Sequence, residues 1–343
     1  MSDIVTSVRS IDLNSAEATA TIPELLISAD SHITEPQDLF DGLPVGVRER
    51  VKLFIGQKQR PDGAMNPKAR IVDQDTDGLK AEVLYPDMCL GMFSSDKDVQ
   101  EAAFPVYNDW IADYAKTSPK RLYGVMGLPV YDIDFAVKEL KAALVWEVPD
   151  PKYPFTGNHY EKLWSAAEEA GIPINLHILT GYNWFKDKVE GIEHIRRGGN
   201  MQVNATKNAL FDLIWSGVFE RHPRLKVVMV ESEIGWVPFT IQQWDYQYDR
   251  VMKTKRTHID LKRKPSEYFF QHVFCTFMDD WVGSRLVADW GADNFMWSSD
   301  YGHPSMTWPH SRAFISRQLG YLPRAKQERI LSKNVIDLYD LDV

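Results

Sequence analysis

Short runs of apolar and β-branched residues recur along most of the chain, and the pattern predicts eight strands. Near-continuous apolar runs, without strict alternation, are typical of parallel strands that are covered on both faces. The eight runs cover residues 25–33, 81–87, 122–130, 142–148, 172–178, 225–232, 273–280 and 294–300.

Helical patterns separate most of these runs, with apolar residues at the spacing of one helix face. The predicted helices cover residues 98–116, 134–140, 159–170, 206–219 and 325–337. Gly171 follows the third of them at a position typical of a helix C-cap. Strands that alternate with helices in this number predict an α/β fold, a (β/α)₈ TIM barrel. A doubly wound open sheet is the alternative, but the Gly-rich phosphate loop that such a sheet usually carries after its first strand is absent from the sequence.

Polar side chains stand where the apolar runs end, which is where a barrel places its catalytic groups. Asp30 and His32 end the first run on alternate positions, so they face the same way. The later runs end in further acids and histidines, namely Asp87, His177, Glu231, Glu233, Asp279, Asp280, Asp300 and His303. Burying an acid beside an imidazole is costly unless the groups are paired or bound to a metal. Carboxylates and imidazoles that converge from several strand ends therefore indicate a site for a divalent metal.

Each of these residues also has a plain structural interpretation. His177 alone is equally a hydrogen-bonded core histidine, Asp300 a turn cap, and Glu231 the buried partner of an arginine. The metal hypothesis rests on their conjunction, because Asp30, His32, His177 and Asp300 follow one another in the order that a barrel site requires.

Composition narrows the classes of partner. A formal net charge of -9 disfavours nucleic acid and anionic membrane, since both need a basic face. The two cysteines favour a reducing, cytoplasmic setting over a disulfide framework. No apolar run approaches the roughly 18–20 residues of a membrane span, and the first twenty residues lack the apolar segment of a signal peptide. We expect residues 1–23 to form a polar N-terminal arm and residues 24–343 to form a single barrel domain.

Four stretches of the sequence resemble the amidohydrolase superfamily, in the branch that contains aminocarboxymuconate semialdehyde decarboxylase and γ-resorcylate decarboxylase. The resemblance covers nearly the whole chain and is specific for the family rather than for one reaction. The stretches are ISADSHITEPQDLF, YEKLWSAAEEAGIPINLHI, LIWSGVFERHPRLKVVMVESEIGWVPF and FMWSSDYGHPSMTWP.

The resemblance implies a distorted (β/α)₈ barrel with a divalent metal at the strand ends. It assigns Asp30, His32, His177 and Asp300 as ligands and makes Asp300 the residue that shuttles a proton. One position departs from the decarboxylases of this branch, which place a histidine where this chain has Glu231.

Because of this departure, the sequence leaves both the identity and the number of the bound metal ions open. Glu35, Glu231 and His303 are further candidate ligands, and the two glutamates make the site richer in carboxylate than a simple zinc decarboxylase needs. Carboxylates that bridge ions permit a second metal, so the candidate cofactors are Zn or Fe/Mn, as one ion or two.

Substrate binding is assigned from weaker signals. Arg196 and Arg197 follow the fifth predicted strand, where an arginine suits a substrate carboxylate, although a charged surface loop explains them equally well. Trp184 lies near the same strand end and is a candidate for the pocket wall, although large aromatic residues more often belong to a core or an interface.

Four functions are open at this stage. The first is a metal-dependent hydrolase in which metal-activated water attacks a small carboxylic acid, amide or lactone, with Glu231 as general base or ligand of a second metal. The second is a dinuclear Fe or Fe/Mn oxygenase that hydroxylates a small carboxylic or amino acid. The third is a non-oxidative decarboxylase. The fourth is a structural subunit of a hetero-oligomer with an active homologue; in the other cases a homo-oligomer is expected.

Overall fold

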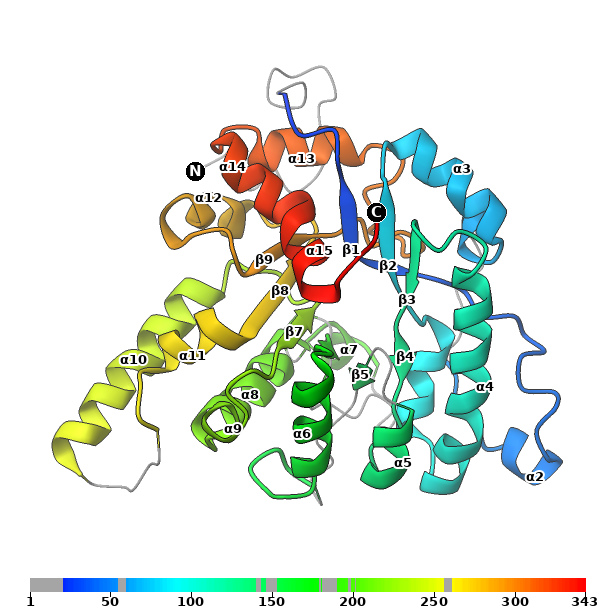
Figure 1. Cartoon of the computed structure of the whole chain (residues 1–343), viewed down its shortest axis with the longest axis horizontal. Helices are drawn as coiled ribbons and strands as arrows, with labels where there is room; N and C mark the ends of the chain where they lie inside the picture. Colours follow the sequence, from blue (N-terminus) through cyan, green and yellow to red (C-terminus); the bar gives the residue numbers. More distant parts are fainter. Residues whose placement is uncertain are drawn as a thin grey trace.

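The computed structural model describes residues 21–54, 60–139, 143–145, 153–178, 180, 190–196, 199–200, 202–255 and 261–343. Within these ranges the chain alternates strands and helices, and the helices surround the strands (Figure 1). The strands are β1 (Ile27–His32), β2 (Ala81–Tyr85), β3 (Leu122–Gly124), β4 (Met126–Gly127), β5 (Ala143–Val145), β6 (Ile174–His177), β7 (Val227–Val230), β8 (Val273–Phe277) and β9 (Phe295–Trp297). Each lies inside one of the predicted runs.

The strands form a parallel barrel in sequence order. The described strands form two hydrogen-bonded sheets, with the strand orders β1-β2-β3 and β4-β5-β6-β7-β8-β9. Every pair of neighbouring strands in them is parallel. The segment after β9 returns to β1, because Asp300 N donates to Asp30 O at 3.1 Å and His32 N donates to Tyr301 O at 2.7 Å. The fold is therefore a (β/α)₈ barrel, as predicted.

The third predicted strand is divided in two. Leu122–Gly124 pairs with β2, whereas Met126–Gly127 pairs with β5, and between them Val125 N donates to Leu84 O at 2.9 Å. The chain turns from one sheet to the other at Val125, which distorts the barrel there.

The structure contains the predicted helices together with helices that the sequence pattern does not predict. They are α2 (Val45–Arg48), α3 (Pro67–Asp77), α4 (Lys97–Ala115), α5 (Ile133–Lys138), α6 (Glu161–Ala170), α7 (Ile192–Arg196), α8 (Gln202–Trp215), α9 (Val218–Arg221), α10 (Val237–Thr254), α11 (Pro265–His272), α12 (Trp281–Trp290), α13 (Ser311–Leu319), α14 (Arg324–Glu328) and α15 (Asn334–Tyr339). The described residues also form the 3₁₀ segments η1 (Asp62–Ala64) and η2 (Met88–Ser94) and the π-helical turn η4 (Arg329–Lys333).

Two predicted helices are interrupted. The helix predicted over 206–219 breaks at Gly217, whose φ of 74° ends α8 and starts α9. The helix predicted over 325–337 contains the π turn η4 between α14 and α15. Gly171 caps α6 with a φ of 67°, as predicted.

Two tyrosine hydroxyl groups, from β2 and α15, meet at one asparagine side chain of β6. Tyr85 of β2 donates to Asn175 of β6 at 2.9 Å, and Tyr339 of α15 donates to the same amide oxygen.

Apolar packing begins before residue 24, since Ile22 is 7% exposed and belongs to the larger core cluster. Residues 1–20 of the predicted arm lie outside the described residues. No helix among the described residues is long and apolar enough to cross a membrane.

Candidate metal centre

The first strand brings Asp30 and His32 together through a local irregularity. Ser28 pairs with Glu82 but Ser31 pairs with Leu84, so β1 holds one residue more than β2 over this interval. Such a bulge re-aims side chains. Asp30 and His32 are both fully buried, and Asp30 Oδ1 lies 3.6 Å from His32 Nε2.

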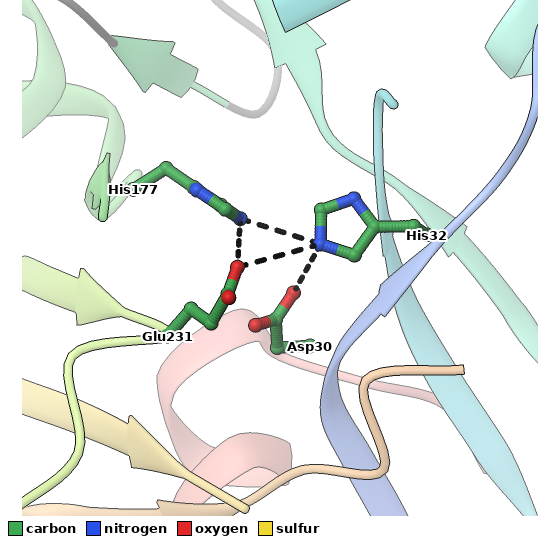
Figure 2. Close-up of side chains that lie close together, drawn as sticks. All are labelled: Asp30, His32, His177 and Glu231. Atoms are coloured by element: carbon green, nitrogen blue, oxygen red, sulfur yellow. Dashed lines mark hydrogen bonds and ion pairs between the residues drawn. The ribbon is translucent and has the colours of Figure 1, made fainter. Parts of the chain in front are cut away.

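Two further strand ends complete a compact group around His32 (Figure 2). His177 ends β6, and its Nε2 lies 3.4 Å from His32 Nε2. Glu231 follows β7, and its Oε2 lies 3.4 Å from His177 Nε2 and 3.9 Å from His32 Nε2. Side chains from β1, β6 and β7 therefore point at one small volume.

The segment after β9 adds a second, overlapping group. Asp300 Oδ1 lies 3.6 Å from His32 Nε2 and 2.8 Å from His303 Nδ1. The His303 ring stacks on the His32 ring at 3.8 Å between centroids. Asp30, His32, His177 and Glu231 are close enough to hold one metal ion, and so are His32, Glu231, Asp300 and His303.

Hydrogen bonding fixes the direction of the His32 ring. Its Nδ1 lies 2.7 Å from the carbonyl oxygen of Pro86 and can donate only if it carries the proton. The tautomer that makes this bond leaves Nε2 with a lone pair directed at the carboxylates, which is the form of histidine that binds metals.

Burial shifts the pKa of every group in the centre for which a shift is resolved. Burial, and then the Asp300 charge, raise the pKa of Asp30 well above its ordinary value. The same two causes raise the pKa of Glu231 to about 8. Burial lowers the pKa of His177 to about 3 and holds that of His32 well below normal. Burial lowers the pKa of His303 too, but Asp300, Asp87 and Glu231 outweigh it and raise that pKa well above normal.

The donor set fits a divalent cation. Neither carboxylate oxygen of Asp30 accepts a hydrogen bond from a residue that the structure describes, although both are buried. Unpaired buried carboxylates are rare because their desolvation is costly. Three carboxylates and neutral imidazoles supply the negative charge and the nitrogen donors that such an ion needs.

Two ligand-bearing positions carry backbone strain. Glu231 has a φ of 53° and Asp300 a φ of 50°, in the left-handed region that non-glycine residues seldom adopt. Thr276 Oγ1 accepts from Glu231 N at 2.7 Å and helps to hold that conformation. Strain of this kind concentrates at functional sites.

Glu35, predicted as a ligand, lies elsewhere. Its carboxylate accepts the backbone N–H groups of Asp87 at 3.0 Å, Met88 at 2.9 Å and Cys89 at 3.3 Å. The Glu35 carboxylate therefore stabilises the start of η2, and both of its oxygens accept hydrogen bonds there. It follows Asp30 closely in sequence, but β1 has ended before it, so proximity in sequence was misleading.

Of the three predicted substrate-binding residues, the structure describes Arg196. Arg196 lies on the short helix α7, is exposed, and pairs with Glu193 of the same helix. Arg197 and Trp184 lie outside the described residues.

The structure adds one residue that the sequence did not single out. Arg60 Nη2 lies 2.5 Å from Asp87 Oδ2, and Asp87 Oδ1 lies 3.7 Å from His303 Nε2. Arg60 also lines a cavity of about 500 Å³ with Met306 and Trp308. A lone arginine in a polar stretch gives no pattern to detect, because its role arises from long-range packing.

Curated relatives match just over half of the chain. γ-Resorcylate decarboxylase from a Polaromonas species is 22% identical over 221 residues, and that from Rhodococcus jostii is 24% identical over 217 residues. Each alignment covers 57% of this chain and 64% of the relative, so the chain matches less than two thirds of the relative's length.

Solved structures share the fold over almost the entire chain. 5-Carboxyvanillate decarboxylase from Sphingomonas paucimobilis superposes with a TM-score of 0.73 at 19% identity, covering 93% of this chain and 100% of that one. Dihydroxybenzoic acid decarboxylase from a Polaromonas species, solved with manganese and 2-nitroresorcinol, gives 0.69 at 18% identity, covering 93% and 98%. At these identities the likeness establishes the fold alone.

A family model described as Amidohydrolase matches residues 57–341, a range that begins after β1 and includes the strands from β2 to β9. This match extends over far more than half of the chain, and the chain therefore belongs to the amidohydrolase family.

Proposed function

We propose that this protein is a metal-dependent, non-oxidative decarboxylase of a hydroxybenzoate-type carboxylic acid. The observation that carries the proposal is the buried, unpaired Asp30 in a cluster of acids and histidines, in a chain whose curated relatives reported above are γ-resorcylate decarboxylases. The sequence alone put hydrolysis first. These relatives favour decarboxylation instead.

Asp30, His32, His177 and Glu231 would hold the ion, with Asp300 and His303 completing the centre. A divalent ion there supplies positive charge that orients and polarises the oxygens of the substrate. Solved decarboxylases of this fold contain manganese, so Mn²⁺ is the first ion to test.

Asp300 is the residue that we assign to proton transfer. Its Oδ1 contacts His303, and its Oδ2 accepts a hydrogen bond from Ser305 Oγ at 2.9 Å, so the carboxyl group is held from both sides. In the reaction a proton is added to the ring carbon that bears the carboxylate. The bond between that carbon and the carboxylate then breaks, its electron pair returns to the ring, and CO₂ leaves.

Glu231 remains the departure from the related decarboxylases, for which the resemblance implies a histidine at this position. We assign the second proton-carrying group to His303 instead. Asp87 and Asp300 flank its ring and favour the charged imidazolium, whose Nδ1 lies 2.8 Å from Asp300 Oδ1 and can pass a proton to it.

The proposal predicts that the Mn²⁺-loaded protein releases CO₂ from 2,6-dihydroxybenzoate or 5-carboxyvanillate without oxygen. Asp300→Asn should abolish this turnover, since an amide cannot transfer the proton, while circular dichroism shows an unchanged fold. Ser305→Ala, which removes only a hydrogen bond to Asp300, is the matched control and should retain part of the activity. Full activity of Asp300→Asn would refute the assignment.

A second candidate function is favoured by one observation, the overlap of the two ligand groups. His32 and Glu231 belong to both groups, which suits a pair of ions bridged by a carboxylate. Two ions that include iron, together with oxygen uptake during turnover, would favour the oxygenase hypothesis over decarboxylation.

A further inference from the structure

A buried ion pair lies directly behind the candidate ligands. Arg70 of α3 and Glu82 of β2 are both 0% exposed, and Arg70 Nε lies 2.5 Å from Glu82 Oε2. Gln74 Nε2 donates to the same carboxylate oxygen at 2.7 Å. Burying two charges is costly, and a buried pair is on its own weak evidence of stabilisation. What this pair contacts is therefore informative.

Arg70 contacts the backbone at the end of β1 and a side chain that follows Asp300. Its Nη1 donates to the carbonyl oxygen of His32 at 2.9 Å. Its guanidinium carbon lies 3.9 Å from the centre of the Tyr301 ring, and Tyr301 directly follows Asp300. The guanidinium group of Arg70 thus contacts both the ligand-bearing end of β1 and the ligand-bearing segment after β9.

Glu82 reaches the same two ends through serine hydroxyls. Ser31, which lies between Asp30 and His32, donates from Oγ to Glu82 Oε1 at 2.9 Å. Ser31 Oγ also lies 3.0 Å from Oγ of Ser299, the residue before Asp300. Ser28 Oγ accepts from Ser299 N at 2.8 Å and fixes the register of the two segments.

We propose that Arg70 and Glu82 are positioning residues for the metal centre. They hold the end of β1 and residues 299–301 in one register, so that Asp30, His32 and Asp300 stay close enough to share an ion. The inference rests on the proposed metal centre but does not depend on which reaction the centre performs.

The test measures the dissociation constant of Mn²⁺ alone, by competition with a chelator at a temperature where every variant is folded. The main variant is Arg70→Met with Glu82→Gln, which removes both charges and so leaves no buried charge unpaired. Loss of groups that orient metal ligands typically weakens affinity about 10- to 100-fold, and we expect a loss in this range. Ser31→Ala removes the hydroxyl that joins Glu82 to Ser28 and Ser299 but keeps the ion pair of Arg70 with Glu82. It should weaken binding by a smaller factor and decides the question if the double variant does not fold.

Asn334→Ala is the matched control for general destabilisation. Asn334 is 1% exposed, and its Nδ2 donates to Ala292 O at 2.6 Å and Phe295 O at 2.8 Å, at the start of β9 rather than its end. It should lower the melting temperature but leave the Mn²⁺ dissociation constant unchanged. Wild-type affinity in the double variant, or an equal loss in Asn334→Ala, would overturn the inference alone. A wild-type chain that binds no Mn²⁺ would overturn the metal centre as well.

Discussion

At the scale of single residues, Asp30 shows the opposition between stability and function. It is fully buried and its oxygens accept no hydrogen bond from the described residues, while Asp300 and Glu231 add negative charge nearby. In a metal-free protein this arrangement is unfavourable, because both burial and the neighbouring charges disfavour its ionised form. When a cation is bound, its positive charge is attracted to these same buried carboxylates, so the arrangement favours metal binding.

Replacing Asp30 with asparagine should therefore stabilise the metal-free protein at neutral pH. The folded-state pKa is raised above the ordinary 3.8, so Asp30 lowers stability as pH rises above 3.8 and has no such effect below it. A gain in the free energy of unfolding is therefore expected at pH 7, and a smaller gain or none at pH 4. Urea unfolding with chelator present, at pH 7 and at pH 4, measures it. An equal gain at both pH values would contradict the electrostatic explanation.

The raised pKa of Glu231 predicts that the affinity for a metal ion depends on pH. Its pKa of about 8 means that the carboxyl group is largely protonated at pH 7 without an ion, and an ion must displace that proton. Mn²⁺ affinity should rise by up to about tenfold per pH unit between pH 6 and pH 8, for each proton released. Calorimetric titration of wild type and Glu231→Gln compares the two slopes, and a variant slope as steep as that of wild type would remove Glu231 from the ligand set.

Single residues were predictable where a pattern marked them. Asp30, His32, His177 and Asp300 end apolar runs, so their positions followed from the strands. Arg60 was not predictable, since only the folded chain brings it to Asp87. Glu35 was predicted as a ligand, but its carboxylate accepts three backbone N–H groups at the start of η2, and the sequence does not show that these groups face it.

At the scale of elements, the strands were more predictable than the helices. Buried parallel strands are apolar throughout, which the sequence displays directly. The helices that were not predicted are α2, α3, α7, α10, α11, α12 and α13. In α3 the buried positions include Arg70, Gln74 and Asp77, so a buried face made of polar residues hides the usual periodicity.

The junction of η1 with α3 gives a test at this scale. A Cβ on Gly63 would lie 2.8 Å from Arg70 Cα and 2.6 Å from Tyr301 Oη, so there is no room for a methyl group. Gly63→Ala should destabilise the fold by about 1–3 kcal/mol, the usual cost of overpacking. Gly42→Ala, where nothing lies within 4 Å, is the control and should change stability by less than about 0.5 kcal/mol. Equal effects in denaturant unfolding would contradict the close packing of this junction.

At the scale of the whole molecule, the barrel collects side chains from β1, β6 and β7 and from the segment after β9 into one centre. Asp30 and Asp300 are far apart in sequence and meet only because the barrel closes. Assembly stays a prediction. Phe239 and Tyr246 of α10 are 69% and 55% exposed, and sedimentation of the purified chain will show whether it forms an oligomer. Activity of the chain expressed alone would argue against the structural-subunit hypothesis.

The metal content of the purified protein is the most direct test of the proposed centre. Elemental analysis after expression with manganese, iron and zinc supplied together measures both the identity and the number of bound ions. We expect at least one divalent ion per chain, and a loss of that ion when Asp30 and His177 are both replaced by alanine. A folded wild-type chain that contains no divalent ion would contradict the metal centre and the function built on it.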